Sequence, residues 1–189
     1  MQTIDNIRFN HSIYLPGDNW ITLLHDISGV HIPIMLPNAH LITFVEAFRS
    51  TATCSQRIQN NTNKNVTLFA YEDNLNWLIA NGSANRLPHL HKVHIFCSST
   101  DKQQFWKSWM QRYRDRFEEP FLANDLDYQL LLIGDRHIDI LKQQFIDVES
   151  VQNHLIQDQR AICQALATHF LNKVNAEDER IRFSEEARE

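Results

Sequence analysis

The chain is predicted to be an α/β protein with a small, mainly parallel sheet and flanking helices. Two buried-strand patterns, at residues 66–71 and 93–97, are each followed by a helix pattern, at 72–82 and 100–116. Alternation of strand and helix with about 25 residues per repeat is typical of a parallel sheet. The second strand pattern is almost continuously apolar, as expected for a strand that is covered on both faces.

Residues 1–60 are expected to form an irregular N-terminal part that packs against the sheet. Two interpretations compete at residues 19–28. In the first, Asp18 caps a helix that Gly29 ends. In the second, residues 20–24 form a strand.

The rest of this N-terminal part contains three further patterns. The apolar stretch 31–36 carries Pro33 and therefore fits an edge strand or an extended connection. Residues 38–49 are predicted to form a helix, because their apolar residues recur at helical spacing. Residues 51–65 are polar and rich in asparagine, which favours an exposed connection or a frayed helix end. The apolar positions of the predicted helix are Leu41, Ile42, Phe44, Val45 and Phe48.

Residues 61–174 are expected to contain the regular α/β core, ending in two long helices. Residues 118–123 are predicted to form a third strand, which Pro120 places at an edge. Residues 124–145 favour a helix because the apolar pattern resumes after Gly134, although 128–133 also fits a strand.

Residues 151–174 show a strong helix pattern. The charged tail at 175–189 is expected to be a solvated helical extension or disordered. The whole of 1–174 is therefore interpreted as one α/β domain.

The composition bounds the classes of function. The chain has 189 residues, 43% of them hydrophobic, and a net charge of −5. An acidic chain has no general attraction to nucleic acid or to an anionic membrane, and no apolar stretch approaches the roughly 18–20 residues of a membrane span. The cysteines at 54, 97 and 163 are odd in number and lack C-x-x-C spacing. Together with the lack of a secretory signal, they predict a reducing compartment, the cytosol.

Acidic side chains follow the predicted strands, at the edge where open α/β sheets bind ligands. Carboxylate and hydroxyl oxygens there are suitable ligands for Mg²⁺. The pattern resembles the acidic pocket of receiver-type signalling domains. It departs from them because no phospho-acceptor aspartate ends a central strand and no lysine follows a late strand. The candidate residues are Glu72, Asp73, Asp101 and Asp125, with hydroxyls from Ser98, Ser99 and Thr100.

The same segments also begin helices, and this gives the favoured interpretation of their acidic residues. Aspartate, serine and threonine are preferred helix caps, and carboxylates suit the positive end of a helix dipole. Thr100 and Gln103 have the spacing of a capping box.

Two other clusters are candidate sites. His89 and His91 form an H-x-H pair whose imidazoles would share one side of a strand, as a metal requires, with His94 opposite. A chance cluster is the favoured interpretation, since no acidic residue or cysteine is near enough to complete the site. Cys97 at a strand end is a possible nucleophile with His137 as base, but a buried, apolar role is preferred.

The helix pattern at 100–116 interleaves aromatic and basic residues, as some proteins that bind single-stranded nucleic acid do. Helical geometry is expected to send the aromatic residues to the core and the charges to water. No nucleic-acid partner is therefore predicted.

The expected function is a non-catalytic regulatory or protein-interaction module. The chain contains no dinucleotide-binding G-x-G-x-x-G, no Walker loop and no H-E-x-x-H. The final helix and the tail are the expected partner-facing elements, for a protein partner or for self-association. The alternative is a divalent-metal-dependent enzyme or a receiver-like switch that uses the acidic residues at the strand ends.

Overall fold

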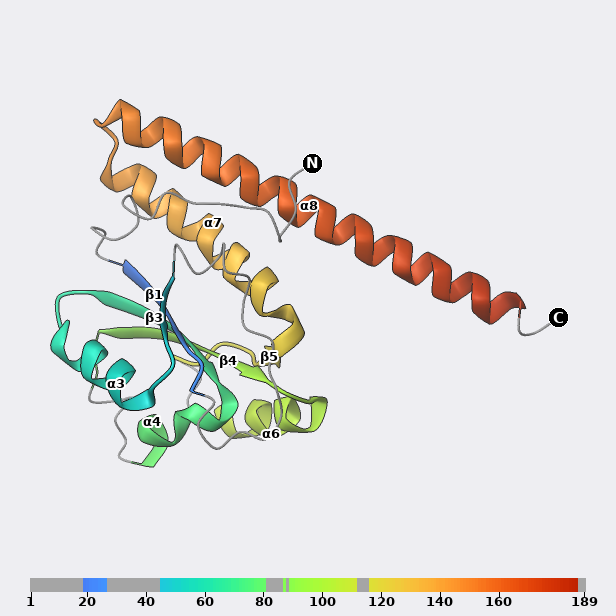
Figure 1. The fold of residues 1–189 in the computed structure, drawn as a ribbon, viewed down its shortest axis with the longest axis horizontal. Helices are drawn as coiled ribbons and strands as arrows, with labels where there is room; N and C mark the ends of the chain where they lie inside the picture. Colours follow the sequence, from blue (N-terminus) through green and yellow to red (C-terminus); the bar gives the residue numbers. More distant parts are fainter. Residues whose placement is uncertain (1–18, 27–44, 81–86, 88, 112–115, 187–189) are drawn as a thin grey trace.

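The sheet is five-stranded and entirely parallel, in the order β2-β1-β3-β4-β5 (Figure 1). The computed structural model describes residues 19–26, 45–80, 87, 89–111 and 116–186. Its strands are β1 (Asn19–Leu24), β2 (Glu46–Phe48), β3 (Asn65–Tyr71), β4 (Leu90–Cys97) and β5 (Phe121–Leu122). This architecture confirms the α/β fold and the strands expected at 66–71 and 93–97.

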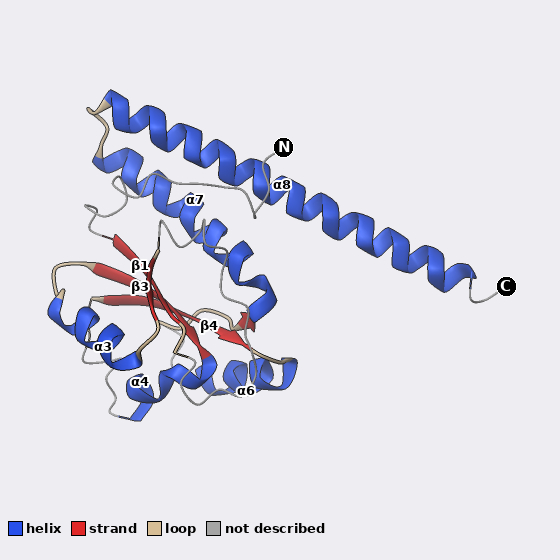
Figure 2. Cartoon of the chain, viewed as in Figure 1, coloured by secondary structure: helices blue, strands red, loops and turns tan. Residues whose placement is uncertain are grey.

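Helices cover both faces of the sheet (Figure 2). The helices α3, α4 and α6 lie against one face, α7 lies against the other, and α8 packs on the outer side of α7. Two short 3₁₀ turns, η1 and η2, directly follow β3 and β5. The bounds are α3 (Thr51–Asn60), η1 (Glu72–Leu75), α4 (Asn76–Ala80), α6 (Thr100–Met110), η2 (Ala123–Asp125), α7 (Leu126–Gln144) and α8 (Glu149–Glu186).

The alternation of side chains along β3 builds the two halves of the core. Leu68 and Ala70 lie in the cluster under α3, α4 and α6, whereas Phe69 and Tyr71 lie in the cluster under α7. Successive side chains of a strand point to opposite faces, so a strand buried on both faces is apolar almost throughout.

The helix considered for residues 19–28 is wrong, and the strand interpretation of residues 20–24 is confirmed as β1. This strand lies inside the sheet, where Thr22–Leu24 pair with β2 on one side and Asn19–Leu24 with β3 on the other. Ile21 and Leu23 face α7 while Leu24 faces the opposite cluster. Pairing on both edges and burial on both faces outweigh a local pattern that also suits a helix.

The helix predicted to continue to residue 49 is wrong at its C-terminal end. Residues 46–48 form β2, which pairs with β1. The remainder of that prediction, at residues 38–44, lies outside the described residues. Pairing with β1 gives the backbone N–H and C=O groups of 46–48 their hydrogen-bond partners, which the apolar spacing of the sequence does not indicate.

Residues 51–60, expected as a connection or a frayed end, form the complete helix α3. Ser50 is its N-cap and accepts a hydrogen bond from the backbone N–H of Thr53 at 3.4 Å. Cys54 and Ile58, one turn apart, are buried against the sheet. Two buried residues on a mostly polar helix give only a weak helical periodicity. Ser50, a favourable N-cap residue, is the stronger sequence indication that a helix begins here.

The C-terminal half follows the predictions more closely. Within 118–123 only Phe121–Leu122 form a strand, which is at the sheet edge as expected. The helix predicted through Gly134 is confirmed as α7, and the strand alternative at 128–133 is wrong. The final helix is confirmed as α8, and the helical extension, one of the two alternatives for the charged tail, is observed as far as Glu186. The predictions for residues 31–36 lie outside the described residues.

Candidate functional site

The strand order identifies one edge of the sheet as the place where a ligand site is expected. It is one of the two common orders of doubly wound sheets, which bind ligands where neighbouring strands lead in opposite directions. The chain passes from β1 to β2 on one side and from β3 to β4 on the other. The expected crevice therefore lies beyond the carboxyl ends of β1 and β3.

Glu72 is the buried carboxylate at this edge, with a side chain that is 2% exposed. Its Oε1 accepts a hydrogen bond from the Ser98 hydroxyl at 2.6 Å, across the ends of β3 and β4. Its Oε2 is buried without a hydrogen-bond partner among the described residues. A half-satisfied buried carboxylate is costly in a fold, so it is a candidate functional group.

Two neighbours of Glu72 are held in their protonated forms. Burial is the main cause that raises the pKa of Tyr71 to about 12, and the Glu72 charge adds to it. Burial followed by the Glu72 charge raises the pKa of Cys97 to about 12 as well. At neutral pH this cluster therefore contains a phenol and a thiol, and neither is a ready nucleophile.

Asp26, which follows β1, is bound to other parts of the same edge. The Asn74 side chain accepts from the Asp26 backbone N–H at 2.9 Å and donates to its carbonyl at 2.8 Å. The Asp26 carboxylate accepts from the backbone N–H and the hydroxyl of Thr51, at 2.8 and 3.0 Å. These hydrogen bonds connect β1, η1 and α3, so the polar groups of Asp26 and Asn74 that make them have a structural role.

The four predicted acidic residues lie in separate places. Glu72 faces Ser98, whereas Asp73 pairs with Lys102 at 3.7 Å on the surface. Asp101 is exposed in the first turn of α6. Asp125 precedes α7 and pairs with Lys173 of α8 at 3.8 Å. Within the part of the chain that the structure describes, no three His, Cys, Asp or Glu residues form a group that could hold a metal.

Capping at the start of α6 differs from the prediction by one residue. Ser99, not Thr100, is the N-cap, and its hydroxyl accepts from the Lys102 backbone N–H at 3.3 Å. The Gln103 side chain donates to the Pro120 carbonyl at 2.8 Å instead of closing a capping box. Gln103 therefore fastens α6 to the segment that leads into β5.

The three histidines around β4 have different environments. His89 is buried, and its Nε2 lies 2.6 Å from the carbonyl oxygen of Ile58 in α3. His91 is exposed. His94 is buried under α7, where its ring stacks on Phe69 with centroids 4.5 Å apart. His94 lies on the face opposite His89, as expected, but His91 lines the same cavity as His94, so the predicted shared side of His89 and His91 is wrong.

The structure rules out Cys97 and His137 as a catalytic pair. Cys97 belongs to the core cluster beneath α3, α4 and α6, and His137 is buried on α7 at the opposite face. The sheet separates the two side chains. The preferred interpretation of Cys97 as a small buried residue is the one that its burial supports.

His25 was missed by the sequence analysis. It follows β1, is buried, and lies edge-on to Tyr71 with ring centroids 5.9 Å apart. Neither ring nitrogen has a hydrogen-bond partner among the described residues. Burial and then the Arg49 charge lower its pKa. Both His25 and Asp26 follow residues 20–24 directly. Their position predicts that they lie at the ligand-binding edge of the sheet only if residues 20–24 are a strand.

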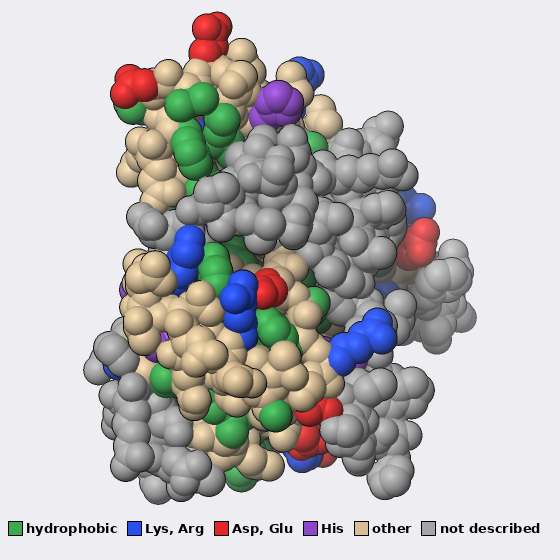
Figure 3. Space-filling model, turned by 60° about the vertical axis from the view of Figure 1, so that its left-hand side comes forward, with side chains coloured by type: hydrophobic (Ala, Val, Ile, Leu, Met, Phe, Trp, Pro, Cys, Tyr) green, Lys and Arg blue, Asp and Glu red, His purple; other side chains and the backbone are tan. Residues whose placement is uncertain are grey.

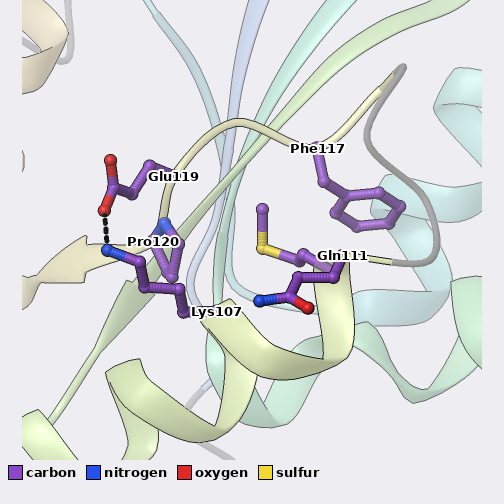
Figure 4. Close-up of a pocket in the computed structure, with 6 residues that line it drawn as sticks. Lys107, Gln111, Phe117, Glu119 and Pro120 are labelled. Atoms are coloured by element: carbon purple, nitrogen blue, oxygen red, sulfur yellow. Dashed lines mark hydrogen bonds and ion pairs between the residues drawn. The ribbon is translucent and has the colours of Figure 1, made fainter.

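A small recess of about 260 Å³ lies beside α6 (Figure 4). Its charged groups are an ion pair between Lys107 and Glu119, and Gln111 lies opposite them. Trp106 and Met110 of the same helix are buried, as the sequence predicted, whereas Phe105 is 59% exposed. Because its two charges neutralise each other, the recess gives little indication of a ligand.

The surface offers no concentration of one charge on the face shown in Figure 3, where basic and acidic side chains of the described residues are interspersed. Within those residues, none of the helices combines the length and apolar character needed to cross a bilayer.

Comparisons of the chain with protein-family models, with curated proteins and with solved structures find no match. Its geometry is therefore the basis for the functional proposals below.

Proposed function

We propose that this protein is a non-catalytic interaction module that associates through α8, and that its partner is a second copy of the chain. The observation that supports this proposal is a second apolar face on α8. A surface helix needs one apolar face to pack on its domain, and another such face is typical of a second interface.

The first face of α8 binds the helix to its own domain. Leu155, Ile162 and Ala165 are buried in the core cluster that contains α7. Further along, the His169 ring stacks on Tyr128 with centroids 5.0 Å apart. These contacts use one side of the helix, and an edge-on contact of Phe170 with the Tyr128 ring, 5.7 Å between centroids, lies at its border.

The second face lies roughly 120° further round the helix, given 3.6 residues per turn. Its large apolar side chains are about half exposed: Ile156 is 52%, Phe170 48%, Leu171 55% and Val174 57% exposed. At this periodicity the four residues fall within an arc of roughly 100°. Cys163, also exposed, lies between Ile156 and Phe170 at seven-residue spacing, which is the repeat of paired helices.

The second face extends to the part of α8 that projects past the sheet and α7 (Figure 1). Beyond Lys173, which pairs with Asp125, the helix continues to Glu186 for about 20 Å. A helical segment of this length is marginal in water by itself, so packing against a partner would stabilise it.

The charges of this segment suit a second copy better than a highly charged partner. Between residues 173 and 186 three basic and five acidic side chains leave a net charge of only −2, so the repulsion between two identical segments is weak. This slightly acidic segment, with the net charge of −5 of the chain, is why neither nucleic acid nor a membrane is proposed as the partner. The charged residues are Lys173, Arg180, Arg182, Glu177, Asp178, Glu179, Glu185 and Glu186.

A cytosolic location belongs to the same proposal. All three cysteines are free, two of them buried and Cys163 exposed. An exposed free thiol close to a proposed interface is compatible with a reducing compartment.

The test is sedimentation equilibrium of the full chain and of two matched variants. Val174→Glu places a charge on the second face, and Asn175→Glu places the same charge one residue away, outside that face. We expect a dimer whose dissociation constant rises at least about tenfold in Val174→Glu and stays unchanged in Asn175→Glu. A monomeric wild type at concentrations of about 100 μM, or equal effects of the two variants, would contradict the proposal.

The runner-up function, a metal-dependent enzyme or a receiver-like switch, is favoured by one observation. Glu72 lies at the carboxyl end of β3, where the strand order predicts a ligand crevice. Its Oε2 is buried and has no hydrogen-bond partner among the described residues. Titration of the wild type and of Glu72→Gln with Mg²⁺, followed by native mass spectrometry, tests it. Binding that disappears in the variant would support a metal site, and no binding to the wild type would exclude it.

A further inference from the structure

A cavity of about 510 Å³ lies between the sheet and α7, away from both the strand-end cluster and the second face of α8. Thr67 of β3 and His94 of β4 line it from the sheet, and Gln129 and Arg136 line it from α7. The segment before β5 forms its rim. Sites for small molecules commonly enclose about 300–1,000 Å³, so this cavity has a sufficient size.

The cavity exists because β5 is too short to continue the sheet. Among the described residues only Phe121–Leu122 pair with β4 as a strand, and the backbone pairing before them is limited to a bridge between Val93 and Phe117. Pro120, which has no backbone N–H to donate, lies between them. The sheet edge therefore opens under α7 instead of being covered by a full strand.

His94 provides a polar group inside the cavity that has no protein partner. Its side chain is 7% exposed, and its Nε2 is buried without a hydrogen bond among the described residues. Burial is the main cause that lowers the pKa of His94 to about 4; the Glu118 charge opposes it, and the Lys92 and Arg136 charges add smaller lowering effects. The ring is therefore neutral at pH 7 and can offer an N–H donor.

One cation of the lining makes no ion pair among the described residues. Lys92 Nζ bonds Glu118 Oε1 at 2.7 Å, and Glu119 is occupied by Lys107. Arg136 is exposed and makes no ion pair or hydrogen bond within the described chain. Its guanidinium presents parallel N–H donors that match a carboxylate.

Apart from the exposed His91, the rest of the lining is apolar. Leu132 and Ile133 of α7 face the cavity together with Phe121 of β5. A ligand that fits this lining has a single negative charge and an apolar body.

We propose that this cavity binds a small monocarboxylate with an apolar body, whose carboxylate pairs with Arg136 and accepts a hydrogen bond from His94. The apolar body lies against Leu132 and Ile133. This site is independent of association through α8, so the two proposals succeed or fail separately.

The test is an NMR titration of uniformly ¹⁵N-labelled full chain with benzoate and hexanoate. Benzamide and hexanamide are the matched probes, since they keep the shape and remove the charge. We expect chemical-shift changes centred on Gln129–Arg136 and on the His94 ring nitrogens, and at least about tenfold weaker binding of the amides. Equal binding of acid and amide, or no shifts there up to about 10 mM acid, would overturn the proposal.

Two variants locate the charge that binds the acid. Arg136→Gln removes the proposed carboxylate partner from an exposed position, and Arg160→Gln makes the same change on α8. We expect Arg136→Gln to weaken benzoate binding at least about tenfold at unchanged Tm, and Arg160→Gln to leave it unaltered. Equal affinities of the two variants would refute the assignment of Arg136.

Discussion

Lowering the pH from 7 to 5 is expected to destabilise this fold through two histidines buried between the sheet and α7. Burial lowers the pKa of His94 and of His137 to about 4, from an ordinary value of 6.5. Since both rings charge more readily in the unfolded chain, acid favours unfolding. The stability that they contribute is complete above pH 6.5 and is lost as the pH falls towards 4.

The magnitude follows from proton linkage. A group with a pKa of about 4 folded and 6.5 unfolded loses about 2 kcal/mol between pH 7 and 5, so the two rings lose about 4 kcal/mol. The lowered pKa of His25 acts in the same direction. The Lys92 hydrogen bond lowers the pKa of Glu118, so its contribution is lost only below its ordinary pKa of 4.5, outside this window.

The assay is urea unfolding at several pH values between 7 and 5, followed by circular dichroism. His137→Gln removes one of the two titrating groups and is expected to reduce the loss of stability to about half. His91→Gln, at an exposed position, is the matched control and should retain the wild-type dependence. A free energy of unfolding that changes by less than about 0.5 kcal/mol from pH 7 to 5 would refute the reasoning.

Three further predictions concern packing, polar satisfaction and thiol chemistry. Ile162→Ala should lower the free energy of unfolding by about 2–5 kcal/mol, because this fully buried side chain packs α8 against α7. Ile156→Ala, at an exposed site of the same helix, should change it little. Urea unfolding measures both variants. Ser98→Ala should cost about 1–3 kcal/mol, since it removes the 2.6 Å donor to the buried Glu72 carboxylate; an unchanged urea midpoint would mean that this bond is dispensable. At a concentration where the chain is monomeric, a thiol reagent should modify Cys163 rapidly in the folded protein and reach the two buried cysteines only after unfolding, measured by mass spectrometry; rapid loss of all three thiols would contradict the described burial.

Much of the fold was predictable where local pattern and tertiary environment agree. The apolar run of 93–97 and the long periodic pattern of 151–174 each admit one structure, and β4 and α8 follow them. The ambiguity at residues 19–28 and the errors at 46–48 and 51–60 fall on short segments whose patterns suit more than one type of element. At such places the sheet decides, because pairing with β1 supplies backbone hydrogen bonds that a local pattern does not encode.

The candidate site was predictable only in part. Glu72 was identified from its place after a strand, but its bond to Ser98 depends on β3 and β4 being neighbours. His25 and Asp26 were missed because their segment was not assigned to the sheet. No sequence motif would have revealed the Glu72–Ser98 bond or the positions of His25 and Asp26, because both depend on which strand ends lie side by side.

By itself the sequence determined the α/β class, the buried strands 66–71 and 93–97 and the two long C-terminal helices, because hydrophobic periodicity depends only on neighbours along the chain. The tertiary structure alone decided the strand order, the separation of the four acidic side chains, and the cavity that joins His94 to Arg136. Those features depend on contacts between residues far apart in the chain, which no local spacing records. The exposure of a second apolar face on α8 belongs with them, since an apolar residue becomes available to a partner only when the folded domain leaves it uncovered.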